Sequence, residues 1–317
     1  MTVSTETDEA KFLNSIELSL VGRPLGEIAR VREVSVSGEK LNATIDLGFP
    51  CESAHDAIRA DIDAALREEK GLRAGDIKLS TRITRHGVQR NLKPIPGVKN
   101  LIAVASGKGG VGKSTVAVNI ALAVSAEGAS VGILDADIYG PSQPEMLGIA
   151  GNIPETKDGK TMLPLQAYGL QVMSMGALVE ADQPLVWRGP MLTSALNQLA
   201  TQTDWEDLDY LIVDMPPGTG DIQLTLSQQI PVSGSVIVTT PQNIATLDAR
   251  KGLAMFRKVA IPVLGVIENM ATHICSNCGH EDAIFGAGGA EKIVDDFEVP
   301  LLGRVPLDSR IREQTDS

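Results

Sequence analysis

The sequence predicts an α/β protein in which a doubly wound, mostly parallel sheet is preceded by a small α+β domain. Two observations lead to this fold class. Downstream of residue 98, short apolar stretches alternate with helical ones, which implies right-handed crossovers within one parallel sheet. Upstream of residue 91 the pattern is different, and Pro94 and Pro96 disfavour helix between the two parts. We therefore expect one domain over 1–90, a linker over 91–98 and a second domain over 99–317.

The first predicted domain holds two helices and three strands. Apolar residues recur every three or four positions over 8–20 and again over 58–66, which is the spacing of an amphipathic helix. Strands are expected at 30–36, 41–47 and 77–83, and a short turn joins the first two as a hairpin. No catalytic constellation is evident in this part of the sequence.

The second predicted domain is built from strands and helices in turn. We expect strands at 101–105, 130–134, 210–213, 235–239 and 263–267, and helices at about 113–127, 189–202, 222–229 and 245–258. Ligands of such sheets bind beyond the carboxyl ends of the strands. The motifs described below follow these strands, so we expect them to share one edge of the sheet.

Charge and composition exclude several classes of function. The chain of 317 residues carries a formal net charge of −12 and only 3% aromatic residues, which argues against nucleic acid as a partner. No apolar run approaches the ~20 residues of a membrane span, and the polar N-terminus is no secretory signal, so we expect no membrane partner. Three cysteines in a long chain fit a reducing cytoplasm better than a disulfide scaffold.

The strongest motif follows the strand expected at 101–105. It lies in a stretch from Ile77 to Ala126 without any Asp or Glu, which indicates a local anion site, although a solvated basic linker explains its first half equally well. The motif G-x-x-x-x-G-K-[ST] between a strand and a helix is typical of a loop that cradles nucleotide phosphates. Lys113 is expected to reach the β and γ phosphates of ATP, and the Ser114 hydroxyl to bind Mg²⁺. The whole predicted nucleotide segment is Gly107, Lys108, Gly109, Gly110, Val111, Gly112, Lys113, Ser114 and Thr115.

Three carboxylates follow later strands. Asp135 ends the apolar strand at 130–134, where a carboxylate is costly unless it meets a cation, so we expect it to hold Mg²⁺ or its water. Asp137 is a candidate to orient or deprotonate the attacking water, with helix capping as the alternative. Asp214 ends the strand at 210–213 and is expected to contact Mg²⁺ indirectly, through water or through another ligand of the metal. The glycine-rich segment at 216–221 after it resembles a switch loop that senses the γ-phosphate.

Cys275 and Cys278 form a C-x-x-C pair. Zinc and 4Fe–4S sites usually have four protein ligands, and Cys51 is far away in the sequence. Three interpretations remain open: two chains share one cluster or zinc ion, His273 and His280 complete a local zinc site, or the thiols form a redox or idle pair.

The motifs together resemble a known family. A lysine directly after the first glycine, here Lys108, is typical of the deviant Walker A group of P-loop NTPases, in which it reaches the nucleotide of a partner subunit. The segments GKGGVGKST, LDADIYGPSQP, WRGPM, VDMPPGTGD, IENM and CSNCG resemble the Mrp/ApbC branch over about 97–312. The N-terminal part is similar to the small iron–sulfur assembly domain found ahead of such ATPases.

The resemblance implies a homodimeric ATPase that binds and transfers iron–sulfur clusters to apoproteins. It implies that Cys275 and Cys278 of two chains bridge a 4Fe–4S cluster, with zinc as the alternative metal. It implies slow ATP hydrolysis with Lys108, Lys113 and Asp137 as catalytic residues and Asn269 as a contact of the adenine ring. Arg188 is a candidate switch partner, with a surface ion pair as its alternative. Relatives continue further at the C-terminus, so we expect this chain to be shortened there.

Two other functions remain open. A positioning ATPase of the ParA or MinD kind would give the cysteine pair no role and would call for a basic surface or an amphipathic membrane helix. A reductase like the nitrogenase iron protein also uses two cysteines per chain, but in those relatives they lie far apart in the sequence.

Overall fold

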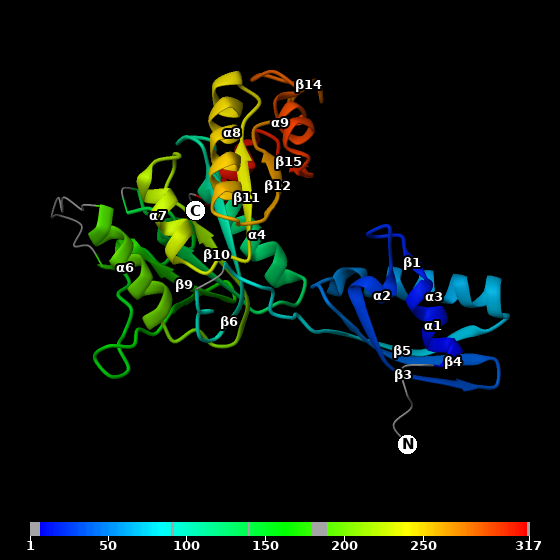
Figure 1. Cartoon of the computed structure of the whole chain (residues 1–317). Helices are drawn as coiled ribbons and strands as arrows, with labels where there is room; N and C mark the ends of the chain where they lie inside the picture. Colours follow the sequence, from blue (N-terminus) through cyan, green and yellow to red (C-terminus); the bar gives the residue numbers. More distant parts are fainter. Residues whose placement is uncertain (1–6, 90–91, 139, 179–188, 316–317) are drawn as a thin grey trace. The chain divides into compact units, whose positions relative to one another are not determined.

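The computed structural model describes residues 7–89, 92–138, 140–178 and 189–315 (Figure 1). The chain forms two compact units. One comprises Met1–Thr84 with Ala126–Ala129, and the other comprises Arg85–Ser125 with Ser130–Ser317. The domain bounds expected from the sequence, with a linker over 91–98, remain a prediction. In the described part of the chain, no helix has the length and apolar character that a membrane crossing requires.

The first unit packs helices on a three-stranded sheet. Strand β3 (Ala29–Ser37) pairs antiparallel with β4 (Lys40–Leu47), and β4 pairs parallel with β5 (Arg73–Thr81). Helices α1 (Asp8–Ser15), α2 (Leu25–Ile28) and α3 (His55–Lys70) belong to the same unit. Its core is built from alternate residues of β4 and from one face of α3, including Leu41, Ile45, Ile58, Ile62 and Leu66.

The helix expected over 8–20 is shorter than its apolar spacing indicates. It ends at Ser15, and Glu17–Leu18 forms β1, which pairs with β2 (Arg23–Pro24). Gly22 between the two strands has a φ of +59°, a conformation that permits the tight turn here. Leu20, one of the residues that suggested the helix, is 51% exposed and contributes nothing to the core.

The second unit confirms the predicted doubly wound, mostly parallel sheet. It has eight strands in the order β15-β12-β11-β6-β10-β7-β9-β8, and every neighbouring pair is parallel except β8 with β9. The strands are β6 (Val98–Ser106), β7 (Val131–Asp135), β8 (Leu165–Ala167), β9 (Leu170–Ser174), β10 (Leu208–Asp214), β11 (Gly234–Thr239), β12 (Val263–Glu268) and β15 (Leu301–Arg304). The β8–β9 hairpin was not among the expected elements.

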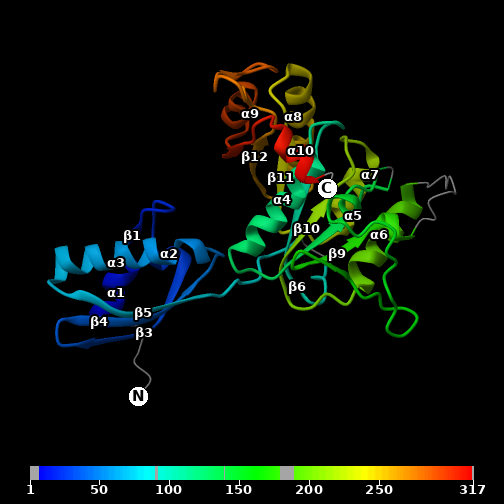
Figure 2. The same cartoon turned by 180° about the vertical axis from the view of Figure 1, so that it is seen from behind.

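Helices cover both faces of this sheet. Helices α6 (Gly189–Gln202), α7 (Asp221–Gln229) and α8 (Asn243–Lys258) lie on one face (Figure 1), and α4 (Lys113–Ala126) and α10 (Ser309–Thr315) lie on the other (Figure 2). The largest core joins α6, α7, α8 and α9 (Gly289–Phe297) to the strands through residues such as Leu196, Leu226, Phe256 and Ile293. The sheet register places Asp135 at the end of β7 directly beside Asp214 at the end of β10.

Candidate nucleotide site and cysteine pair

The glycine-rich loop between β6 and α4 depends on glycine at specific positions. Gly110 and Gly112 have φ values of +80° and +77°. A Cβ atom at Gly112 would lie 2.2 Å from Nδ2 of Asn269, and one at Gly107 would lie 2.2 Å from the backbone carbonyl carbon of Asp248. Side chains are therefore excluded at these two positions by close approach, and the loop leads directly into the first turn of α4, where backbone N–H groups bind phosphate well.

Lys113 lies buried at the start of α4. Its ammonium group forms an ion pair with the Asp214 carboxylate and a hydrogen bond of 3.2 Å to the Ser114 hydroxyl. Three residues predicted separately for phosphate and Mg²⁺ binding are thus in contact. Thr115, the last residue of the predicted segment, lies one position further along α4, and Val111 is buried in the loop.

Asp135 is the second buried carboxylate of the site. Its Oδ2 accepts backbone hydrogen bonds from Ser142 and Gln143 at 2.9 and 3.0 Å, and its Oδ1 accepts one from Asp137 at 3.1 Å. Burial, together with the neighbouring Asp214 carboxylate, raises the pKa of Asp135 to about 7, although the backbone donors oppose the shift. A cation near both carboxylates would relieve their repulsion.

Gln143 is a residue of this site that the sequence reasoning missed. It is the first residue of α5 (Gln143–Met146), and its Nε2 donates to the Ser114 carbonyl at 3.0 Å and to Asp214 Oδ2 at 2.8 Å. Its only sequence signal is its position a few residues after Asp137, in a segment quoted for its family resemblance.

Asp137 and three residues of the 216–220 segment line a cavity of about 560 Å³. Asp137 is buried, and Pro216, Pro217 and Gly220 are among the other residues that line this cavity. The Gly218 N–H donates to the Ser106 carbonyl at 3.0 Å, which connects this segment to the start of the phosphate loop. Lys108 is half-buried in that loop, and its carbonyl accepts a hydrogen bond of 2.9 Å from the Ser106 hydroxyl. Arg188 lies outside the described residues.

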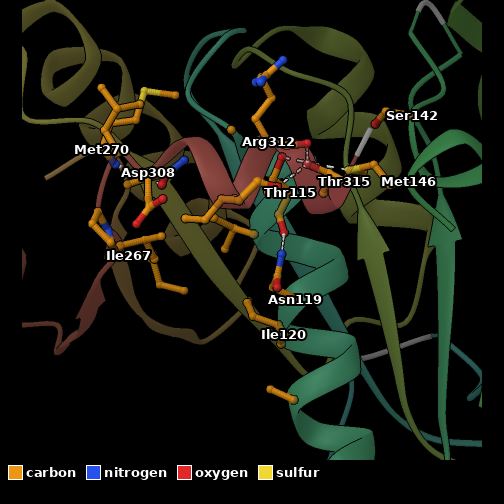
Figure 3. Close-up of a pocket in the computed structure, with 18 of the residues that line it drawn as sticks. Thr115, Asn119, Ile120, Ser142, Met146, Ile267, Met270, Asp308, Arg312 and Thr315 are labelled. Carbon is orange, nitrogen blue, oxygen red and sulfur yellow. Dashed lines mark hydrogen bonds between the residues drawn. The ribbon is translucent and has the colours of Figure 1, made fainter. Parts of the chain in front are cut away.

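A larger cavity of about 1030 Å³ opens beside the phosphate loop (Figure 3). Thr115, Asn119 and Ile120 of α4 line one side, and Met270 and Asp308 line another. Asn269 also lines it, but both ends of its side-chain amide have protein partners. Its Nδ2 donates to the Val111 carbonyl at 2.9 Å and its Oδ1 accepts from the Met270 N–H at 3.0 Å. Asn269 therefore holds the phosphate loop, and its predicted contact with adenine stays a prediction.

Cys275 and Cys278 lie in a hairpin between β13 (His273–Ile274) and β14 (Glu281–Asp282). The Cys275 N–H donates to the His280 carbonyl and the Gly279 N–H donates to the Cys275 carbonyl, both at 2.9 Å. Backbone donors at Cys278 and Asn277 lower the pKa of the Cys275 thiol, which favours the thiolate that binds metal. Cys278 is exposed, whereas Cys51 is buried in the core of the first unit.

The hairpin brings two thiols close together, fewer ligands than a metal site usually has. Within the residues that the structure describes, no group of three or more His, Cys, Asp or Glu side chains is arranged to hold a metal ion. His273, one of the candidates for a local zinc site, instead has its Nδ1 within 3.0 Å of the Leu307 carbonyl. Further ligands would have to come from outside this arrangement.

A run of backbone hydrogen bonds joins the base of the hairpin to the larger cavity. The Val305 N–H donates to Glu268, the Ala271 N–H to Val305, and the Leu307 N–H to Thr272, at 2.9, 3.0 and 2.7 Å. With the contact between His273 and Leu307, residues 268–273 are tied along 305–307. One end of this ladder adjoins Asn269 and the phosphate loop, and the other end adjoins Cys275.

A comparison with known families gives a match over most of the chain. A family model described as "ParA: NUBPL iron-transfer P-loop NTPase" matches residues 97–317. The chain belongs to this family. The resemblance inferred from its motifs is therefore confirmed, and the buried Lys113–Asp214 pair and the glycine loop lie within the matched part of this NUBPL-family chain.

Two relatives of this NUBPL-family protein match it over most of their length. An iron-sulfur cluster carrier protein of Pseudomonas fragi is 58% identical over 257 residues, which cover 81% of this chain and 90% of the relative. The iron-sulfur cluster carrier protein of Escherichia coli K12 is 52% identical over 292 residues, which cover 92% of this chain and 79% of the relative.

Solved structures share the fold of the second unit. A nucleotide-binding protein from Archaeoglobus fulgidus in complex with ADP, with cobalt found, matches with a TM-score of 0.61 and 35% identity, covering 69% of this chain and 86% of that one. The cell division ATPase MinD of Pyrococcus furiosus matches with a TM-score of 0.52 and 24% identity, and the match covers 68% of this chain and 86% of MinD. This similarity concerns the fold alone.

Proposed function

We propose that this protein binds iron–sulfur clusters and transfers them to apoproteins, and that ATP binding and slow hydrolysis drive the cycle. The observation that carries the proposal is a pair of accessible thiols whose hairpin is hydrogen-bonded to the wall of the nucleotide cavity. Chains that are 58% and 52% identical to this one are named iron-sulfur cluster carrier proteins.

The residues present fit ATP and Mg²⁺. Gly107 and Gly112 leave a cradle that a Cβ atom would fill, and the Ser114 hydroxyl with the Asp135 and Asp214 carboxylates supplies the oxygen donors that Mg²⁺ prefers. When bound, Mg²⁺ would neutralise charge on the β and γ phosphates. Lys113 would leave Asp214 to contact the same phosphates, and the N–H groups at the start of α4 would bind them from the other side.

Asp137 is the residue suited to the attacking water. Asp137 lines the same cavity as Pro216, Pro217 and Gly220. A carboxylate in this place can accept a hydrogen bond from water and orient it for attack. Lys108 would supply a second positive charge to the transferred phosphoryl group, from the partner subunit if the family arrangement holds. Because few positive charges contact the transferred phosphoryl group, we expect ATP hydrolysis to be slow.

The cluster is the cargo of the protein. Two thiolates per chain cannot complete the four-thiolate shell of a 4Fe–4S cluster, whereas a two-fold dimer brings the same pair of each chain together. A homodimer is therefore part of the proposal, with cytoplasmic apoproteins as recipients. Thiolates on an exposed hairpin leave such a cluster open to ligand exchange, which suits delivery. Zinc between the same four thiolates is the alternative occupant, and it would favour the positioning ATPase.

Anaerobic reconstitution with iron and sulfide tests the proposal. The wild-type protein should gain the broad visible absorbance of an iron–sulfur cluster and should then activate an apo-ferredoxin. Cys275→Ser and Cys278→Ser should each abolish both properties, while ADP binding persists. Cys51→Ser is the matched control, since its thiol is buried in the other unit, and it should behave as wild type. Normal cluster transfer by either Cys275→Ser or Cys278→Ser would refute the carrier function.

A further inference from the structure

Gln143 is a fully buried glutamine between two loops of the nucleotide site. It is 0% exposed, and the chain places it eight residues after Asp135. Its backbone N–H holds Asp135 Oδ2, and its side-chain Nε2 holds the Ser114 carbonyl and Asp214 Oδ2. One residue thus connects both buried carboxylates to the start of α4.

The orientation of its side-chain amide follows from these partners. The Ser114 carbonyl and the Asp214 carboxylate are both acceptors, so the atom that faces them has to be the donor nitrogen. The Oε1 atom is consequently turned the other way. It is buried and has no hydrogen-bond partner among the described residues.

An unpartnered buried carbonyl oxygen is costly, because it has lost its water without gaining another donor. Almost all buried polar atoms of folded proteins have a partner. The hydroxyl of the adjacent residue, Ser142, is also buried without a partner among the described residues, and it lies on the wall of the larger cavity (Figure 3). Ser142 and Gln143, whose backbone N–H groups both donate to Asp135 Oδ2, thus each have a buried polar side-chain atom that a hydrogen-bond donor of a ligand would satisfy.

We propose that Gln143 is a positioning residue for Mg²⁺ at the nucleotide site. Its Nε2 fixes the Asp214 carboxylate when Lys113 turns to the phosphates, and its Oε1 accepts a hydrogen bond from a water molecule bound to the metal. A magnesium ion in a nucleotide site usually keeps several of its waters, and those waters are strong donors. This inference rests on the proposed binding of nucleotide with Mg²⁺.

Its test is the Mg²⁺ requirement of ADP binding, measured with a fluorescent ADP analogue in EDTA and across a series of Mg²⁺ concentrations. Gln143→Leu keeps most of the volume but removes both polar atoms. It should raise the Mg²⁺ concentration for half-maximal ADP binding by about tenfold, the scale of a lost hydrogen bond to a charged group. The affinity for ADP in EDTA should change much less. A residue that only stabilised the fold would weaken binding equally under both conditions.

Gln171→Leu is the matched control. Gln171 is also buried, on β9, but both ends of its amide have partners on Glu206, at 3.1 Å for Nε2 and 2.9 Å for Oε1. This variant should keep the wild-type Mg²⁺ requirement. Gln143→Asn, which keeps an amide but is one methylene shorter, should show the same raised requirement as Gln143→Leu and serves if the latter does not fold.

The outcomes separate the inference from the function on which it rests. A wild-type protein that bound no ADP would refute the proposed nucleotide function. The wild-type protein could instead bind ADP with Mg²⁺ while Gln143→Leu or Gln143→Asn needs the same Mg²⁺ concentration as wild type. That result would leave the nucleotide function intact and overturn the role of Gln143. Equal weakening with Mg²⁺ and in EDTA would likewise overturn it.

Discussion

Lys113 and Asp214 form a buried ion pair at the carboxyl edge of the sheet, with side chains that are 5% and 0% exposed. The same ammonium group contacts the Ser114 hydroxyl. Lys113 therefore occupies two of the three oxygen donors that the sequence assigns to Mg²⁺, and Asp135 is the third. The proposed binding of phosphates and metal would require the lysine to turn away, and Gln143 would remain to hold Asp214.

The first prediction concerns the two lysines of the loop. Lys113→Ala should lower ATP hydrolysis by about 10²-fold, the scale of one lost contact to transition-state charge. Lys108→Ala should also lower hydrolysis but should keep nucleotide affinity closer to wild type, because its proposed contact is with the partner's nucleotide. Steady-state phosphate release and ADP titration measure both. Near-normal turnover of Lys113→Ala would contradict the assignment, and equal loss of affinity in both variants would contradict a role of Lys108 across the dimer.

The second prediction is that the ion pair matters for stability as well. Removing one partner of a buried pair leaves an uncompensated charge and costs about 3–5 kcal/mol. Lys113→Met should therefore lower the free energy of unfolding in urea by about this amount. The double variant Lys113→Met with Asp214→Asn should recover much of the loss, because the pair is then removed as a whole and Asp214 no longer carries an unpaired charge. A double variant as unstable as Lys113→Met would show that the ion pair is not the cause.

The third prediction uses the raised pKa of Asp135. Its pKa is about 7 in the folded protein against an ordinary 3.8, so between these values the folded chain holds a proton that the unfolded chain releases. Stability contributed by this group is then present at low pH and is lost as pH rises toward 7, with a slope of at most about 1.4 kcal/mol per pH unit.

Urea unfolding without divalent metal or nucleotide checks this dependence. The difference in unfolding free energy between wild type and Asp135→Asn isolates the group, because asparagine has nearly the same size and does not titrate. Between about pH 5 and 7 the unfolding free energy of wild type should fall relative to that of Asp135→Asn, and above about pH 8 the difference should stay constant. A difference that is constant with pH, or that shifts in favour of wild type, would show that the buried carboxylate keeps an ordinary pKa.

The parts of the site that sequence reasoning located are those encoded by short local patterns. The ends of β6, β7 and β10 carry the phosphate loop, Asp135 and Asp214, and the parallel register brings them together. The role of Gln143 could not be predicted, because its partners Ser114 and Asp214 lie 29 and 71 residues away in the chain. The hydrogen-bond ladder between residues 268–273 and 305–307 could not be predicted for the same reason, since His273 and Leu307 are separated by 34 residues.

The fourth prediction concerns the stoichiometry of the cargo. One cluster shared by two cysteine pairs gives about four iron atoms per two chains. Iron and sulfide analysis with mass measurement in solution should therefore find the cluster only on dimers. A dimer formed from one wild-type chain and one Cys275→Ser/Cys278→Ser chain should hold no stable cluster, because only two thiolates remain. About four iron atoms on a single chain would contradict the shared site.

The last prediction is that nucleotide and cluster affect each other through the ladder between residues 268–273 and 305–307. If the cluster changes the affinity for ADP by some factor, ADP has to change the affinity for the cluster by the same factor, and such couplings are typically about 5–150-fold. Anaerobic calorimetry of ADP binding to cluster-loaded and cluster-free protein measures the factor.

His273→Ala removes the side-chain contact to the Leu307 carbonyl and should bring the factor toward one, while the cysteines still bind the cluster. His280→Ala is the matched control, because only the His280 backbone carbonyl takes part in the hairpin contacts given above, and it should keep the wild-type factor. An unchanged factor in His273→Ala would show that the coupling runs by another route, such as the dimer interface itself.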